Sequence, residues 1–150
     1  MRDYIHTQPG TLMRIVFGGG TVVVGAIALI LTQRQPSAAY PLLAVAAVMG
    51  ACLLLFDSLT VSVSRQEIQL WFGVGLISKR FAVADIEHAE IVRNHWMYGW
   101  GIRYTPHGWL YNVSGFDAVQ IRLTNGRQYR IGSDEPAELL RAIERARGER

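Results

Sequence analysis

The sequence contains little charge, a single cysteine and a single lysine. Charged residues make up 18% of the 150-residue chain, whereas a soluble domain usually contains about a quarter. Low charge combined with 50% hydrophobic residues excludes an intrinsically disordered chain, which needs the opposite composition. One cysteine excludes an internal disulfide framework and a cysteine-based zinc cluster. We therefore expect no cofactor and no metal site.

No segment carries a dense run of positive charge. The net charge is +3 at pH 7, and the basic residues are spread along the chain. Proteins that bind nucleic acids need clustered Lys and Arg side chains to neutralise phosphates. The sequence therefore predicts that nucleic acid is not a partner.

Two long uncharged runs occupy the first third of the chain. Ile15–Thr32 is 18 residues long and Ala38–Phe56 is 19 residues long. At about 1.5 Å per residue each run spans about 27–29 Å, which matches the hydrocarbon core of a bilayer. Neither run has the polar stripe of a soluble amphipathic helix. We predict that residues 1–56 form an N-terminal tail and a transmembrane hairpin, with spans at 12–32 and 38–56.

Two other interpretations fit the runs less well. A cleavable signal peptide would end at a small-residue site such as Ala26–Ala28, but the apolar run continues past it. A buried hairpin of a soluble fold would need a large apolar partner surface, and residues 57–150 offer too little. Arg2 and Arg14 precede the uncharged run of the first span, so the positive-inside rule favours a multi-pass protein of the inner or plasma membrane with both termini in the cytoplasm.

Small residues recur at four-residue spacing in both spans. Thr21 with Gly25, and Ala46 with Gly50, are pairs of the kind that lets helix backbones approach closely. Such faces favour packing within the hairpin or between copies of the chain. A structural membrane subunit that forms homo-oligomers is therefore one alternative function.

The pattern changes to an alternation of apolar and polar residues after Asp57, which is typical of half-buried strands. Strands are expected over residues 59–64, 67–72, 76–83, 86–93, 101–105, 109–114, 119–124 and around 129–131. Asn125-Gly126 predicts a type I′ hairpin turn, because this pair tolerates positive φ best. An amphipathic helix is predicted at 134–147, with Pro136 in its first turn.

Two segments carry a resemblance to a known group of proteins. Residues 96–115 (WMYGWGIRYTPHGWLYNVSG) and 127–136 (RQYRIGSDEP) resemble a signature of uncharacterised small bacterial membrane proteins with a transmembrane hairpin and a pleckstrin-homology-like (PH-like) domain. The resemblance implies a strongly bent sheet of about seven antiparallel strands over residues 57–150, closed by one C-terminal helix. It implies a fold and no activity.

Seven of the 15 aromatic residues lie between Trp96 and Phe116. Three interpretations remain open for this aromatic segment: rings that fill the core, rings that lie at the membrane interface, and a binding site for a partner. The candidate binding residues are Trp96, Tyr98, Trp100, Arg103, Trp109 and Tyr111.

Catalytic patterns have little support in this sequence. The histidines lack metal-ligand spacing, and His107, Ser114 and Asp117 supply the letters of a triad without a nucleophile elbow. The first predicted hairpin loop offers Arg65 alone, so the basic cluster of phosphoinositide-binding PH domains is absent. We expect a non-enzymatic binding or assembly module that contacts the lipid bilayer and recognises a protein partner, a lipid surface or a second copy. A lipid-modifying enzyme that uses His95 or His107 is the remote alternative.

Overall fold

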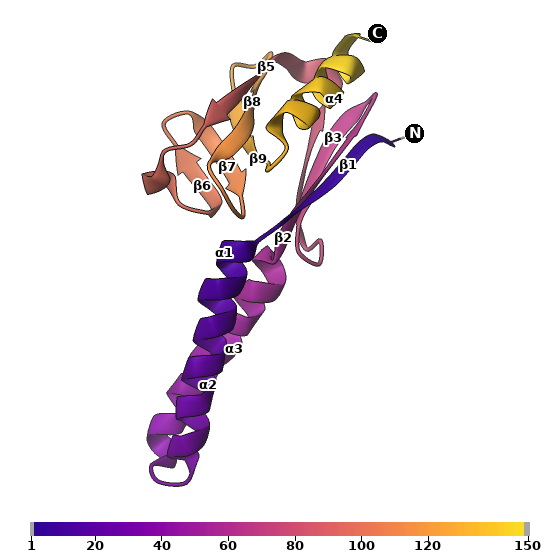
Figure 1. Cartoon of the computed structure of the whole chain (residues 1–150). Helices are drawn as coiled ribbons and strands as arrows, with labels where there is room; N and C mark the ends of the chain where they lie inside the picture. Colours follow the sequence, from indigo (N-terminus) through magenta and orange to yellow (C-terminus); the bar gives the residue numbers. More distant parts are fainter. Residues whose placement is uncertain (1, 149–150) are drawn as a thin grey trace.

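Two long helices project from a β-rich domain in the computed structural model (Figure 1). The structure describes the backbone of residues 2–148 and the side chains of residues 4–148. The elements are β1 (Arg2–Pro9), α1 (Thr11–Met13), a π-helical turn (Arg14–Gly18), α2 (Gly19–Thr32), α3 (Pro36–Phe56), β2 (Ser58–Ser64), β3 (Glu67–Phe72), β4 (Ile77–Ala82), η2 (Val83–Asp85), β5 (Ile86–Arg93), η3 (Trp96–Tyr98), β6 (Gly101–Thr105), β7 (Gly108–Asn112), β8 (Asp117–Leu123), β9 (Gln128–Gly132) and α4 (Pro136–Gly148).

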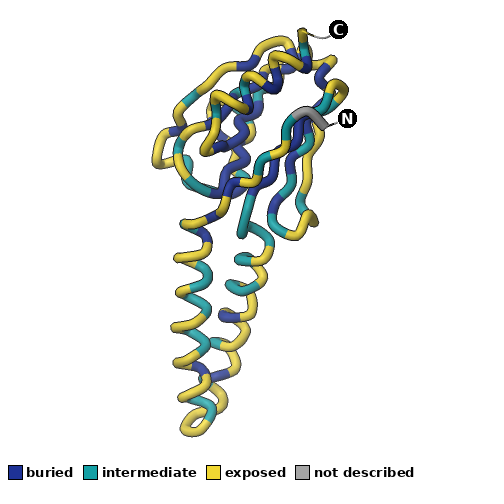
Figure 2. The backbone as a smooth tube through the Cα atoms, turned by 45° about the vertical axis from the view of Figure 1, so that its right-hand side comes forward, coloured by how far each residue is buried: buried dark blue, intermediate teal, exposed yellow. Residues whose placement is uncertain are grey.

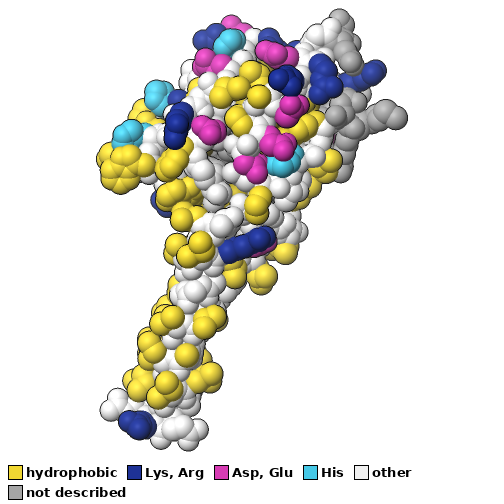
Figure 3. All heavy atoms as spheres, in the orientation of Figure 1, with side chains coloured by type: hydrophobic (Ala, Val, Ile, Leu, Met, Phe, Trp, Pro, Cys, Tyr) yellow, Lys and Arg dark blue, Asp and Glu magenta, His cyan; other side chains and the backbone are white. Residues whose placement is uncertain are grey.

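The two predicted spans form an antiparallel helical hairpin. Thr11–Thr32 and Pro36–Phe56 are each long and apolar enough to cross a membrane. Few of their side chains are buried, and large aliphatic side chains cover the outside of both helices (Figures 2 and 3). A surface of this kind is unfavourable in water, because each of these exposed aliphatic side chains would gain about 1.5–3 kcal/mol on transfer to an apolar environment.

The contact between the helices uses small residues. Ala28, Ala39 and Ala46 are buried, and a Cβ at Gly20 would lie 2.1 Å from the Met49 Cε. A Cβ at Gly25 or Gly50 would meet no neighbour. Ala46 therefore packs inside the hairpin, whereas these two glycines do not.

The second helix begins two residues earlier than expected. Pro36 occupies its first turn, where the missing amide hydrogen costs nothing. Pro41 therefore lies inside the helix, where it is exposed on the outer face.

The N-terminal tail is a β-strand of the domain. β1 pairs with β2 in antiparallel register, with His6 opposite Val61 and Pro9 opposite Ser58. The sequence alone groups this tail with the hairpin, because its polar residues carry no clear alternation. The helical hairpin is thus the connection between two neighbouring strands (Figure 1).

Two sheets make up the domain. Sheet A has the order β1-β2-β3-β4 and is antiparallel throughout, and sheet B has the order β5-β8-β9-β7-β6. Eight strands follow Asp57, and β7 and β9 are parallel. The expected antiparallel pairing of all strands is therefore interrupted. β5 pairs with β8, and β8 pairs with β9. The β6–β7 hairpin, which follows β5 in the chain, therefore joins sheet B at the other edge of β9.

The C-terminal helix covers the core between the sheets. Leu139, Ala142, Ile143 and Ala146 are buried on one face of α4, as its amphipathic pattern predicts. The Ser133 Oγ accepts a hydrogen bond of 3.0 Å from the Glu135 amide just before the helix. The core continues through inward-facing residues of both sheets, including Leu59, Ile68, Leu70, Phe72, Ile121 and Ile131.

The turn between β8 and β9 is a hairpin turn of a different type from the one predicted. Gly126 has a φ of +81°, but no described non-glycine residue has positive φ. Asn125 therefore does not adopt the type I′ conformation. Its Oδ1 instead accepts a hydrogen bond of 3.0 Å from the Arg127 amide, which closes a longer loop.

We predict that Gly108→Ala destabilises the domain more than Gly126→Ala. Both glycines have positive φ, so each alanine costs about 1–2 kcal/mol in backbone strain. A Cβ at Gly108 would also lie 2.0 Å from the Gln128 carbonyl oxygen, whereas one at Gly126 would meet nothing. Urea unfolding of the full chain in detergent micelles, followed by tryptophan fluorescence, measures both free energies. Equal losses would contradict the close packing of β7 against β9.

An ion pair joins the two helices where they meet the domain. The Arg14 side chain donates from Nε and Nη2 to the Asp57 carboxylate, with Nη2 2.9 Å from Oδ2. The Gly10 amide donates to the Asp57 carbonyl at 2.7 Å. The hydrogen bonds from Arg14 lower the pKa of Asp57 below its ordinary value of 3.8.

We expect Asp57→Asn to lower the thermal unfolding midpoint at pH 7. Because the folded-state pKa of Asp57 is lowered, its contribution to stability is complete above about pH 5 and is lost as the pH falls through that pKa. The difference between the two proteins should therefore disappear at low pH. Glu138→Gln, which removes the exposed pair with Arg141 on α4, is the matched control. A difference that persists unchanged at pH 2 would contradict this assignment.

Candidate functional site

The aromatic segment divides into buried and exposed parts. Tyr111 is 8% exposed and belongs to the core, where its ring lies 6.4 Å from that of Phe72. Trp96 and Tyr104 are 67% and 75% exposed. The interpretation of these rings as core therefore fits Tyr111, and the exposed rings are available to contact other molecules.

The first part of the segment forms the short helix η3. The His95 Nδ1 accepts a hydrogen bond from the Met97 amide, and Trp96 and Met97 point into solvent. The Tyr98 ring lies between those of His95 and His107, at 6.2 and 6.4 Å. Trp96 and Tyr98 are thus close together in sequence but have different surroundings.

Trp100 contacts the loop that joins sheet B to the N-terminal tail. Its Nε1 donates to the Gly115 carbonyl at 3.2 Å, and its ring lies 6.0 Å from that of Phe116. The Gln8 side chain donates to the neighbouring Ser114 carbonyl at 2.9 Å. This end of sheet B is therefore attached to β1, close to the start of the helical hairpin.

The β6–β7 hairpin presents two aromatic rings as a cross-strand pair. Tyr104 is opposite Trp109, and their rings lie edge to face with centroids 5.4 Å apart. Trp109 is 42% exposed. Arg103, on the same strand as Tyr104, is exposed and its Nε donates to the Trp100 carbonyl at 3.2 Å. It does not join the aromatic pair through any described contact.

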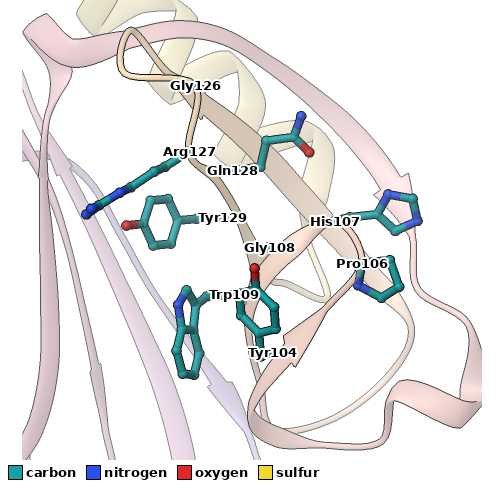
Figure 4. A pocket seen from close by; sticks show the side chains of 9 residues that line it. All are labelled: Tyr104, Pro106, His107, Gly108, Trp109, Gly126, Arg127, Gln128 and Tyr129. Carbon is teal, nitrogen blue, oxygen red and sulfur yellow. The ribbon is translucent and has the colours of Figure 1, made fainter.

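A cleft of about 680 Å³ lies beside this pair. Its lining includes Tyr104, Trp109, Arg127 and Tyr129, and a second hollow that shares three of these residues continues to Ile77, Lys79 and Ile102. Figure 4 shows the side chains of Trp109, Tyr129 and Arg127 close together on one side, whereas those of Pro106 and His107 lie on the other. We call the two connected hollows the aromatic cleft.

Two cationic side chains line the aromatic cleft. Lys79 follows the same face of β4 as Ile77 and the buried Phe81, so it points between the sheets. Its Nζ lies 6.0 Å from the Tyr129 ring centroid, a cation–π distance. Arg127 lines both hollows. Within residues 4–148 neither cation forms an ion pair, so both can bind an anionic group.

A buried arginine supports the outer face of sheet B. Arg130 is 7% exposed, and it donates to the Gln120 Oε1 at 2.8 Å and to the Asn94 Oδ1 at 3.1 Å. Burial lowers its pKa. Because Asn94 directly precedes His95 and η3, the hydrogen bond from Arg130 connects β9 to the start of the aromatic segment.

The predicted candidates and the aromatic cleft overlap in part. Trp109 lines both hollows and Tyr111 lines the second, whereas Trp96, Tyr98, Trp100 and Arg103 lie outside both. Lys79, Arg127 and Tyr129 are not among the residues that the sequence predicts. A lysine in the alternating series Ile77, Lys79, Phe81 is the signal that would have found the first of them, because a cation on an apolar face is unusual.

Reactive groups are not brought together in the described part of the chain. His107 lies at the tip of the β6–β7 hairpin, at the opposite end of β7 from Ser114. Residues 4–148 contain no group of three or more His, Cys, Asp or Glu side chains that could hold a metal ion.

Comparison with protein families, with curated proteins and with solved structures finds no match for this chain. Its function must therefore be inferred from the geometry of the molecule itself.

We predict that Tyr111→Ala and Tyr104→Ala differ strongly in stability. Truncating the buried Tyr111 ring should cost about 3 kcal/mol, as for other large aromatic residues in cores. Truncating the exposed Tyr104 should cost less than about 1 kcal/mol. Chemical unfolding of the full chain in micelles measures both values, and a large loss for Tyr104→Ala would assign that ring to the core.

Proposed function

We propose that this protein is a membrane-anchored, non-enzymatic recognition module, in which the aromatic cleft binds an acidic, extended segment of a partner protein. The observation that carries the proposal is the pair of cations, Lys79 and Arg127, that flank exposed aromatic rings without an ion-pair partner among the described residues.

A PH-like architecture for the domain is supported by its topology. Seven strands, β1 to β4 with β5, β8 and β9, pair antiparallel with their neighbours and are followed by one C-terminal helix. One strand of this set, β1, comes from the N-terminal tail. The β6–β7 hairpin is then an addition to the PH-like core, and it supplies the exposed ring pair of the cleft.

Membrane insertion of the hairpin is supported by its exposed apolar surface and by its charges. Arg14 and Arg34 bracket an uncharged segment of 19 residues, which is about 28 Å of helix. Both ends of the hairpin then emerge on one side of the bilayer, together with the domain. The basic residues before the first span favour the cytoplasmic side.

The chemistry of the cleft favours a ligand that combines carboxylates with an extended backbone or aromatic groups. Arginine binds carboxylates with two parallel hydrogen bonds, and aromatic rings such as Trp109 supply contact area at low entropic cost. Acidic side chains of a partner satisfy both cations. Tethering the domain to the membrane raises its effective concentration toward membrane-bound partners.

At the first hollow of the cleft, a protein partner is favoured over a lipid by position. The residues that line it include Gly108, at the start of β7, and Gly126, in the β8–β9 turn. They are at the opposite end of β7 from Asn112, whose loop contacts Gln8 near the hairpin. Four residues of strand separate these ends, about 13 Å.

Photo-crosslinking in the native membrane tests this proposal. A benzophenone amino acid replaces Tyr104 in the full chain, in the cells that produce the protein. We expect an adduct with a protein of defined mass. Lys79→Glu and Arg127→Glu should each reduce its yield about tenfold or more, because a hydrogen bond to a charged group contributes about 1.5–3 kcal/mol.

Arg80→Glu is the matched control, because it makes the same charge change on the opposite face of β4. The adduct should survive this substitution. Crosslinks to lipid alone, or equal yields from the Lys79→Glu and Arg80→Glu proteins, would overturn the proposal. An adduct with twice the mass of the chain would identify a second copy as the occupant instead.

A further inference from the structure

A turn of the β-domain lies beside the end of the second membrane helix. The β3–β4 turn, residues 73–76, reaches the level of the top of α3 (Figure 1). A Cβ at Gly73 would lie 2.2 Å from the Leu54 carbonyl oxygen and 2.9 Å from that of Leu55. The Gly73 amide donates to the Ser58 carbonyl at 2.9 Å. These contacts hold the turn against the helix.

The side chains of this turn are apolar and exposed. Val74 and Leu76 are 67% and 78% exposed, and they are among the most exposed aliphatic residues of the described chain. No charged residue occurs between Phe72 and Ser78. Trp71 adds an aromatic ring at the same place, since a Cβ at Gly75 would lie 3.9 Å from its Cδ1. We call Trp71, Val74 and Leu76 the turn patch.

The turn patch is continuous with the apolar surface of the hairpin. Val74 and Gly73 line a shallow recess together with Leu53, Leu54 and Asp57. Leu54 is 63% exposed. The patch therefore extends the lipid-facing surface of α3 sideways onto the domain.

The depth of the turn follows from the charges of the hairpin. Arg14 pairs with Asp57 and marks the polar boundary. Leu53 lies opposite Gly18, one helical turn farther from the domain, at 3.6 Å from a Cβ at that glycine. Val74 lines one recess with both Leu53 and Asp57, which places it at the boundary between headgroups and acyl chains.

We infer that the β3–β4 turn inserts Val74 and Leu76 into the interface of the same bilayer that the hairpin crosses, and so fixes the orientation of the domain on the membrane. Exposed aliphatic side chains gain free energy there, and a tryptophan is favoured at headgroup level. The occupant of the turn patch is thus lipid. This inference rests on the membrane insertion proposed above, and not on the ligand of the aromatic cleft.

Spin labelling of the full chain in vesicles tests the inference. Cys52→Ala removes the lone native thiol, and single cysteines then carry a nitroxide at Val74, Leu76, Val48 or Asn125. Val48 is an exposed residue of α3 and reports hairpin insertion, whereas Asn125 lies in the β8–β9 turn and is the water-exposed control. The vesicles contain phosphatidylcholine with phosphatidylglycerol, and collisions with oxygen and with a water-soluble nickel chelate are compared.

We expect the oxygen-to-nickel ratio at positions 74 and 76 to shift from the value at Asn125 toward the value at Val48. Ratios at both positions equal to that at Asn125, with a lipid-like ratio at Val48, would overturn the inference and leave hairpin insertion intact. A water-like ratio at Val48 would overturn the insertion itself, and the inference with it. Two labelled turn positions guard against a local effect of either substitution.

Discussion

The pairing of β1 with β2 immediately above the helical hairpin is the constraint on which the rest of the structure depends. The two strands run directly into the two helices, and the Gly10 amide and the Asp57 carbonyl make the last backbone hydrogen bond between them. The Arg14–Asp57 ion pair follows within one helical turn. The joint has no linker, so the domain cannot rotate freely relative to the helices. The direction of the hairpin therefore determines which surfaces of the domain face a membrane.

The aromatic cleft exists because sheet B extends beyond the strands that pack against sheet A. β5, β8 and β9 cover the core together with sheet A and α4, β7 adds Tyr111 to that core, and the rest of the β6–β7 hairpin extends sheet B farther. The extension leaves a hollow between β4 and β7, and Tyr129 and Trp109 are among the residues that line it. The Lys79 ammonium group reaches this hollow beside the Tyr129 ring. The lining of the cleft thus shares Tyr111 and Tyr129 with the core.

The sequence predicts most elements and little of their assembly. The uncharged runs and the alternation after Asp57 are local patterns, so they indicate the helices, the strands and α4 to within a few residues. The pairing of β1 with β2 and of β7 with β9 depends on contacts between distant residues, and no local pattern encodes it. Residues 2–9 are a strand because β2 offers them a partner, not because of their own alternation.

The candidate site shows the same division. Crowding of aromatic residues between Trp96 and Phe116 indicates the correct segment, but composition does not reveal which rings are buried. Tyr111 and Tyr104 lie on the same face of one hairpin, but Tyr111 is at the end that packs into the core, whereas Tyr104 is next to the exposed tip. Lys79 and Arg127 come from other elements, and only the folded chain brings them to the same cleft.

The insertion of the hairpin between two paired strands has a consequence for biosynthesis. β1 leaves the ribosome first, but its partner β2 emerges only after both helices have been made. In the proposed orientation a chain that has inserted one helix leaves β1 and β2 on opposite faces of the bilayer, where they cannot pair. Sheet A can then close only on chains whose second helix has crossed back. The domain therefore folds only after membrane integration is complete, and incompletely inserted chains remain susceptible to proteolysis.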